Sequence, residues 1–235
     1  MSEASETVMA ETVGPLLEAE NLSKGFGKTV ALDGLSLQIS GGEVVAILGP
    51  SGSGKSTLLL CLAGVLSPDG GDVRYRGRSL GAVSDTVRTR LRRDEFGFVF
   101  QFGQLVPELT VEENILLPVW VNRALHAEER LALVYRVLPE LQEMRERRAL
   151  LLSGGQQKLA ALARALAVGT RLLLLDEPFE GVAPVLSKRL AEVIAGLKGS
   201  AVSVLMAQSD LNHARSLVDH EVVIERGTNA ALTTV

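Results

Sequence analysis

The fold of this chain is decided by one stretch, Gly49-Pro50-Ser51-Gly52-Ser53-Gly54-Lys55-Ser56-Thr57. It has the form Gly-x-x-x-x-Gly-Lys-Ser/Thr of the loop that wraps nucleotide phosphates. The apolar run before it, residues 44–48, is typical of a buried strand, and residues 58–63 continue as an apolar helix. Glycines let backbone N–H groups point inward at an anion, and the start of the helix adds partial positive charge. We therefore predict a nucleoside triphosphate site in which Lys55 reaches the β- and γ-phosphates and Ser56 ligates Mg²⁺.

Composition restricts the remaining function classes. The chain has 235 residues, of which 46% are hydrophobic, and a net charge of −4. This balance gives no bulk electrostatic reason to expect nucleic acid as a partner. The only cysteine, Cys61, follows the phosphate loop in an apolar helix and is expected to be a core residue. The longest apolar run, residues 58–66, is about half the length a membrane-spanning helix needs.

Hydrophobic periodicity predicts alternating strands and helices. Strands are expected at 16–22, 34–40, 43–48, 72–76, 96–101, 171–176, 201–207 and 220–225. Helices are expected at 55–66, 85–93, 111–122, 127–138, 154–168, 185–197 and 210–217. This order favours a mainly parallel sheet with helices on its faces. Residues 102–165 carry helix signals and no convincing strand, and residues 1–14 are expected to be a disordered tail.

Two carboxylates, Asp176 and Glu177, follow the apolar run 172–175 of the strand predicted at 171–176. In a parallel sheet, ligands gather at the carboxyl ends of the strands. We expect Asp176 to hold Mg²⁺, directly or through water, and Glu177 to polarise the attacking water. The alternative is that both are acids in a turn before Pro178 with no chemical role.

The run Ser153-Gly154-Gly155-Gln156 opens the helix predicted to reach Val168. A serine cap followed by two glycines makes a second exposed helix N-terminus, and hence a second anion site. One small domain has little use for two such sites on one nucleotide, whereas two copies arranged head to tail have an obvious use. The alternative is an ordinary capped helix start.

The order of these motifs resembles the nucleotide-binding subunit of ATP-binding-cassette (ABC) transporters. The resemblance rests on residues 49–57 (Walker A), Gln101, 152–156 (the signature) and 172–177 (Walker B) and covers about 16–227. It implies a P-loop NTPase fold with a RecA-like, mixed but mainly parallel sheet, an antiparallel β edge and an inserted helical subdomain at about 102–165. Residues 15–235 would form this one ATPase domain.

The same resemblance implies roles for individual residues. Phe26 takes the place of the aromatic ring that stacks on adenine, although it could also be a core phenylalanine. Gln101 resembles the glutamine that contacts Mg²⁺ and the attacking water, and the segment from Phe102 to Val111 would face a membrane partner. The signature residues 153–156 would bind the ATP held by the opposing protomer.

Two positions depart from the family pattern. Gln208 follows the predicted strand where a histidine is usual, and its amide can donate to the γ-phosphate but takes up no proton at neutral pH. Ala183 stands where the family has an aspartate. Residues 181–184 together with Gln208 resemble the branched-chain amino-acid importer type, whereas 97–118 resembles the lipoprotein-release and macrolide-export type.

The sequence therefore predicts an ATP-hydrolysing subunit that powers a membrane ABC transporter by ATP-driven dimer closure. It would work with transmembrane permease subunits on the cytoplasmic face of the plasma membrane, as a homodimer or as a heterodimer with a second ABC ATPase. The alternative is a non-transport ATP switch or scaffold with slow hydrolysis.

Overall fold

The computed structural model describes residues 14–101, 104–122, 124–210 and 215–230. Its strands are β1 (Leu17–Phe26), β2 (Thr29–Ile39), β3 (Val44–Leu48), β4 (Gly70–Tyr75), β5 (Arg78–Ser79), β6 (Phe96–Val99), β7 (Leu172–Asp176), β8 (Ser203–Gln208), β9 (His220–Glu225) and β10 (Thr228–Asn229). Its helices are α1 (Lys55–Leu62), α2 (Asp85–Asp94), α3 (Val111–Trp120), α4 (Ala127–Val137), α5 (Pro139–Glu143), α6 (Gly154–Ala167) and α7 (Pro184–Leu197), with a 3₁₀ turn at Ala149–Leu151.

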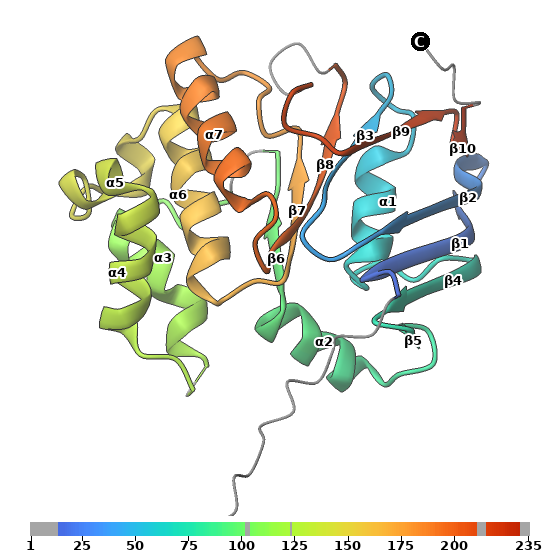
Figure 1. Cartoon of the computed structure of the whole chain (residues 1–235), viewed down its shortest axis with the longest axis horizontal. Helices are drawn as coiled ribbons and strands as arrows, with labels where there is room; N and C mark the ends of the chain where they lie inside the picture. Colours follow the sequence, from blue (N-terminus) through green and yellow to red (C-terminus); the bar gives the residue numbers. More distant parts are fainter. Residues whose placement is uncertain (1–13, 102–103, 123, 211–214, 231–235) are drawn as a thin grey trace, which may run out of the picture.

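The strands form two sheets, which Figure 1 shows on the right and in the centre of the molecule. The larger has the order β10-β9-β3-β8-β7-β6, and β9, β3, β8, β7 and β6 pair in parallel. The smaller sheet, β2-β1-β4-β5, is antiparallel throughout. The predicted fold class, a mainly parallel sheet with an antiparallel β edge, is confirmed.

The central strands are apolar on both faces because each face covers its own core. In β3, Val44 and Ala46 belong to the core shared with the helical layer, whereas Val45 and Ile47 belong to the core around α1. Strand β7 alternates in the same way. Helix α1 thus lies between the two sheets, and the continuous apolar runs read from the sequence reflect two-sided burial.

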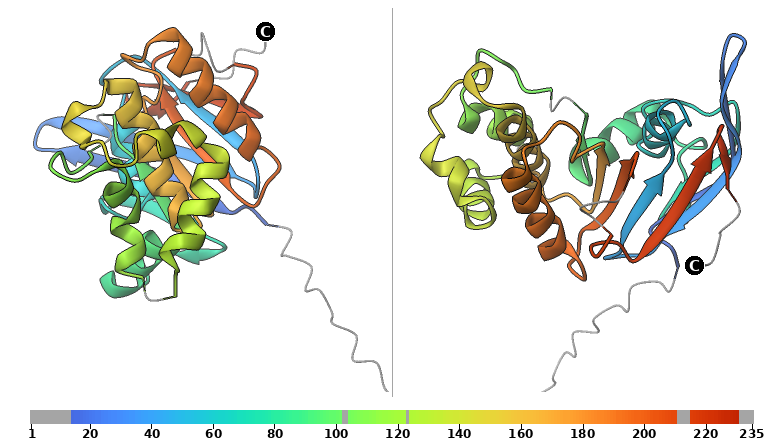
Figure 2. Two further views of the ribbon diagram at one scale, coloured as in Figure 1. Left: turned by 90° about the vertical axis from the view of Figure 1, so that its left-hand side faces the viewer. Right: turned by 90° about the horizontal axis from the view of Figure 1, so that it is seen from above.

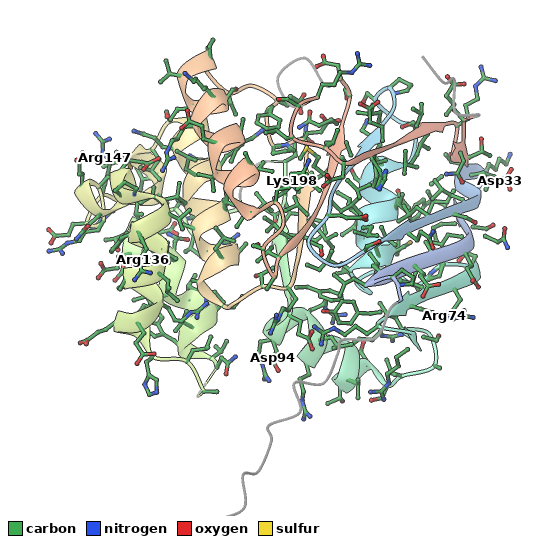
Figure 3. All side chains as sticks on the ribbon, in the orientation of Figure 1. Asp33, Arg74, Asp94, Arg136, Arg147 and Lys198 are labelled. Atoms are coloured by element: carbon green, nitrogen blue, oxygen red, sulfur yellow. The ribbon has the colours of Figure 1, made fainter. Side chains whose placement is uncertain are left out.

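Helices α3 to α7 cover the opposite face of the parallel sheet, as the turned views in Figure 2 show. Helix α3 packs along α6, and the buried side chains Ile115 and Leu162 belong to the same core. Figure 3 shows Arg136 and Arg147 pointing away from this helical layer. Most charged side chains of these helices lie outside and most apolar ones face inward, as an amphipathic helix requires, with buried Lys158 of α6 as an exception.

The structure reproduces each predicted strand, with shifted ends in all but β9. Strands β1 and β2 are longer than expected because they form one hairpin that turns at Gly27, whose φ is +61°. The two-residue strands β5 and β10 and the short helix α5 carry too few residues to show a period. Helix α1 ends at Leu62, four residues before the predicted end at 66. Most of the predicted tail, Phe102 and part of the predicted helix 210–217 lie outside the described residues, and 215–217 form a turn.

Gly71 and Gly196 offer a matched test of this packing. Gly71 has a φ of +82°, and a Cβ there would lie 2.3 Å from the carbonyl oxygen of Glu20, whereas a Cβ at Gly196 in α7 would meet nothing within 4 Å. We expect Gly71→Ala to lower the free energy of unfolding by about 1 to 3 kcal/mol and Gly196→Ala to raise it by about 0.5 to 1 kcal/mol. Urea unfolding followed by circular dichroism measures both. Equal effects of the two substitutions would contradict the positions of β1 and β4.

Candidate functional site

The phosphate loop joins β3 to α1 and is pressed against two other strands. A Cβ at Gly49 would lie 2.3 Å from the carbonyl oxygen of Ile224 in β9. A Cβ at Gly54 would lie 2.3 Å from the carbonyl oxygen of Ala31 in β2, and Gly54 has a φ of +103°. Only glycine fits at these two positions, and the tight approach of both sheets fixes the path of the loop.

The interior of this loop suits an anion. Helix α1 starts at Lys55, and its first-turn amides have no acceptor within the helix. Its first turn carries no acidic side chain that would compete for these amides. The hydroxyl oxygen of Ser53 is buried and has no hydrogen-bond partner among the described residues. An unpaired buried donor beside a helix N-terminus fits a phosphate group.

Lys55 extends from α1 across the loop. Its ammonium group donates to the carbonyl oxygens of Gly49 at 2.7 Å and Pro50 at 3.1 Å. It also lies 3.2 Å from Oε1 of Glu177 and 3.4 Å from Oγ of Ser209. The lysine therefore links the loop after β3 with the segments that follow β7 and β8.

Asp176 ends β7 beside the start of α1. The hydroxyl of Ser56 donates to Oδ1 of Asp176 at 3.1 Å. Burial raises the pKa of the Asp176 carboxyl, and the Ser56 hydrogen bond opposes that rise. A hydroxyl and a carboxylate oxygen at this separation are the hard ligands that Mg²⁺ prefers, so the residues present fit the predicted metal.

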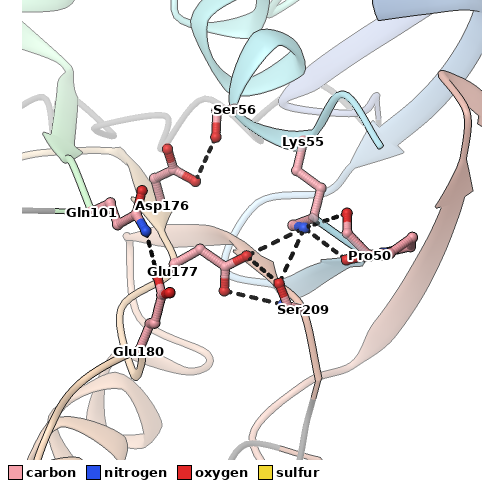
Figure 4. Close-up of polar contacts among 9 residues, drawn as sticks. Pro50, Lys55, Ser56, Gln101, Asp176, Glu177, Glu180 and Ser209 are labelled. Carbon is pink, nitrogen blue, oxygen red and sulfur yellow. Dashed lines mark hydrogen bonds and ion pairs between the residues drawn. The ribbon is translucent and has the colours of Figure 1, made fainter. Parts of the chain in front are cut away.

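Glu177 follows in a backbone conformation unusual for a residue with a side chain, with a φ of +46°. Its backbone N–H donates to the carbonyl oxygen of Ala207 at 3.0 Å, and its own carbonyl accepts from Lys158 Nζ at 2.7 Å. Its carboxylate accepts from the hydroxyl of Ser209 at 2.7 Å and from the backbone N–H of Ser209 at 3.1 Å (Figure 4). Residues held in left-handed backbone are concentrated at functional sites. In Glu177, hydrogen bonds fix both the backbone and the carboxylate.

Gln208 lies inside β8 rather than after it. The strand pairs with β3 as far as Leu48 opposite Gln208, one residue beyond the predicted end, and Gln208 is only 4% exposed. In the amide orientation that satisfies both of its polar atoms, its nitrogen donates to Oε2 of Glu177 at 3.2 Å and its oxygen accepts from the N–H of Phe179 at 3.3 Å. The first residue beyond the strand is Ser209, which the sequence reasoning did not single out.

Gln101 lies on the helical side of the site. Its amide nitrogen donates to the carboxylate of Glu180 (Figure 4). Lys158 of α6 donates to the carbonyl oxygens of both Glu177 and Glu180, and burial lowers the pKa of its ammonium group. Sequence reasoning missed Glu180 and Lys158, although a lysine within the apolar run of α6 was a signal for the second.

The signature residues form the start of α6. The Ser153 hydroxyl accepts from the N–H of Gln156 at 3.4 Å, and the Gln156 side chain accepts from the N–H of Ser153 at 3.0 Å. Gly154 faces open space, whereas a Cβ at Gly155 would lie 2.5 Å from Leu186. Within the described residues, 153–156 make no hydrogen bond or ion pair with the phosphate loop, so the chain keeps its two predicted anion sites apart.

Phe26 and Ala183 complete the predicted set. Phe26 ends β1 at the tip of the hairpin and is 52% exposed, and Lys24 Nζ lies 5.9 Å from its ring centroid. The ring is therefore a surface feature and not part of the core. Ala183 is the cap residue of α7, where it supplies no side-chain hydrogen bond.

Comparison with known proteins agrees with this geometry. The model of the ABC transporter family matches residues 32–180. The chain is 34% identical to the high-affinity branched-chain amino acid transport ATP-binding protein BraG of Pseudomonas aeruginosa, over 93% of this chain and 95% of that one. It is 42% identical to the lipoprotein-releasing system ATP-binding protein LolD of Paramagnetospirillum magneticum, over 81% of this chain and 87% of that one.

Solved structures show the same architecture. The dimeric ATP-binding cassette MJ0796, in a post-hydrolysis state bound to ADP and Pi, superposes with a TM-score of 0.84 at 29% identity, over 92% of this chain and 97% of that one.

The fold and the phosphate loop define a P-loop ATPase. The chain belongs to the ABC transporter family, in which it is an ATP-binding and ATP-hydrolysing subunit. A branched-chain amino acid transport protein and a lipoprotein-releasing protein thus both match most of the chain.

Replacing the buried carboxylate of Asp176 tests its environment. Because burial raises its pKa, ionised Asp176 destabilises the folded state at neutral pH, and this cost vanishes in acid, where the carboxyl is protonated in both states. We expect Asp176→Asn to raise the thermal midpoint at neutral pH but not in acid, and to lower Mg²⁺-dependent ATP turnover by about a hundredfold or more. Differential scanning fluorimetry and phosphate release measure the two effects.

The matched control is Asp33→Asn, because Asp33 is exposed on the surface shown in Figure 3. It should change neither quantity. A lower midpoint in Asp176→Asn at neutral pH, with full turnover, would contradict both the burial cost and the metal assignment.

Proposed function

We propose that the residues around Lys55 and Glu177 hydrolyse ATP to drive a membrane permease. The observation that carries the proposal is the 3.2 Å contact between Lys55 Nζ and Glu177 Oε1, which joins the phosphate loop to the end of β7. A cation that reaches phosphate oxygens thereby lies beside a carboxylate that can accept a proton from water. Both side chains project from rigid elements, so the backbone that carries each of them is held in place before substrate binds.

In this assignment, residues 49–57 hold the phosphates, and Phe26 stacks on adenine. Ser56, Asp176 and Gln101 are the residues whose side-chain oxygens would hold Mg²⁺, and the bound ion would neutralise charge on the phosphate oxygens. Glu177 takes a proton from the attacking water while the water oxygen bonds to the γ-phosphorus. At the same time, the bond from that phosphorus to the bridging oxygen of ADP breaks. Gln101 would have to give up its hydrogen bond to Glu180 to take part in holding Mg²⁺.

The second half of the proposal concerns pairing. The separation of 153–156 from the phosphate loop within the described chain supports a dimer in which each signature helix faces the ATP of the other protomer. The N–H groups of Ser153 and Gln156 are bonded within the cap, so the glycine at the exposed helix start, Gly154, would present its own N–H to a γ-phosphate. ATP then favours the closed dimer because it contacts both protomers only in that state.

The helical part at about 102–165 is proposed to carry the motion to the permease. The buried side chain of Asn114 fixes the backbone of Val106, accepting from its N–H at 2.8 Å and donating to its carbonyl at 3.0 Å. The N–H of Leu150 donates to the carbonyl of Pro107 at 3.1 Å. Val106, Leu150 and Leu151 are exposed apolar residues of this region, which suits contact with a permease.

No helix among the described residues is long and apolar enough to cross a bilayer. We place the subunit on the cytoplasmic face of the plasma membrane, attached through that permease. Its partner in the dimer is a second copy of this chain, or a second ABC ATPase.

Glu177→Gln tests the proposed general base. It preserves the shape of the side chain but removes its basicity, so turnover should fall at least about a hundredfold while ATP binding persists. ATP-dependent dimers should then accumulate, as measured by size exclusion with light scattering. Glu128→Gln, on the exposed start of α4, is the control and should behave as wild type. Undiminished turnover in Glu177→Gln would remove Glu177 from this role.

Mixing inactive variants tests the head-to-tail arrangement. Lys55→Ala and Ser153→Arg should each be inactive alone, but a mixed dimer contains one site with an intact loop and an intact signature. With random pairing, half the dimers are mixed, and in each mixed dimer one of the two sites is intact. About a quarter of wild-type activity should therefore return. Lys55→Ala mixed with Glu177→Gln should restore no activity. Lys55 and Glu177 of one protomer serve the same site, so each site of a mixed dimer lacks one of the two. Equal results from the two mixtures would overturn self-pairing.

A further inference from the structure

The residue that follows β8 has contacts that none of the assigned roles uses. Ser209 donates its hydroxyl to Oε1 of Glu177 at 2.7 Å and its backbone N–H to Oε2 at 3.1 Å. Its hydroxyl oxygen accepts from Lys55 Nζ at 3.4 Å. One serine therefore contacts both charged groups of the proposed catalytic pair. It donates a hydrogen bond to each oxygen of the carboxylate.

Sheet order explains why this residue sits there. Strand β8 lies between β3 and β7, and all three run parallel. The segments that leave their carboxyl ends carry Lys55 after β3, Ser209 after β8 and Glu177 after β7 (Figure 4). The middle position brings a short hydroxyl side chain within reach of both neighbours, and the register of β8 ends the buried strand at Gln208.

We propose that Ser209 is the positioning residue for Glu177 in the ATP-bound enzyme, and that it senses whether Lys55 has moved to the phosphates. This inference rests on the assignment of Glu177 as the general base. When Lys55 turns to the β- and γ-phosphate oxygens, Glu177 loses its ion-pair partner. The two donors of Ser209 remain and keep the carboxylate aimed at the water, while the serine oxygen is freed from the lysine.

Ser209 itself takes no proton in this scheme. The proton of the attacking water goes to the carboxylate of Glu177, and ADP leaves with the electron pair of the broken bond. The hydroxyl of Ser209 donates throughout, as a neutral alcohol does at physiological pH. Gln208, which is buried within the strand, donates to Oε2 of the same carboxylate at 3.2 Å, and its amide oxygen accepts from the N–H of Phe179.

The test uses the full chain with Mg²⁺-ATP and compares Ser209→Ala with Ser209→Thr. The alanine keeps the backbone donor and loses the hydroxyl, which donates to a charged group, so kcat should fall about ten- to hundredfold. KM and the affinity for a fluorescent ATP analogue should stay within about twofold, because the phosphate contacts are intact. Ser209→Thr retains the hydroxyl and should recover most of the turnover. Ser67→Ala, at an exposed serine distant in sequence, is the control.

A double-mutant cycle shows whether Ser209 acts through Glu177. Adding Ser209→Ala to Glu177→Gln should cause no further loss, because the group that the serine positions is already inactive. A further tenfold loss in the double variant, or a threonine variant as poor as the alanine one, would assign Ser209 a structural role and overturn the inference. Full turnover in Ser209→Ala with an inactive Glu177→Gln would overturn it while leaving the proposed function standing. Full turnover in Glu177→Gln would overturn both.

Discussion

The ammonium group of Lys55 and the carboxylate of Glu177 face each other with side chains only 5% and 12% exposed. A charge at such a position is stable only while it has a partner, since an unpaired buried ion costs several kcal/mol. Lys55 belongs to the phosphate loop and Glu177 to the end of β7, so the pair couples two segments that lie far apart in the sequence. A nucleotide that draws Lys55 to its phosphates must leave Glu177 with other partners, and the neighbouring strand end supplies them.

That exchange is possible because the surrounding backbone does not move easily. The loop is trapped between the carbonyls of Ala31 and Ile224, where no side chain fits at Gly54 or Gly49. Strands β3, β8 and β7 form the buried centre of the parallel sheet, covered by α1 on one face and by the helical layer on the other. In the proposed mechanism, a few side chains therefore exchange partners on this rigid support.

The helical layer is connected to this support at the same place. Lys158 of α6 binds the backbone carbonyls of Glu177 and Glu180, and Glu180 in turn accepts from Gln101. A movement of Gln101 toward the proposed metal site would release the carboxylate of Glu180, while the bonds from Lys158 to the backbone carbonyls of Glu177 and Glu180 would remain. The proposed general base Glu177 and the helical layer thus share a short turn, 177–180, which joins the proposed catalytic site to α6.

The sequence by itself determined the chemistry of the phosphate loop and the class of fold. Residues 49–57 carry their function in local geometry, since glycines, a lysine and a helix start are consecutive in the chain. Continuous apolar runs at 44–48 and 172–175 also disclosed a buried parallel sheet, because two-sided burial removes the alternation of an exposed strand. What the sequence left undecided was how the ends of β3, β8 and β7 line up. Register shifts by one residue exchange a buried side chain for an exposed one, and no local pattern distinguishes Gln208 from Ser209. Tertiary pairing of β8 with β3 made that choice, and contacts between distant segments likewise brought Lys158, Glu180 and Gln101 together.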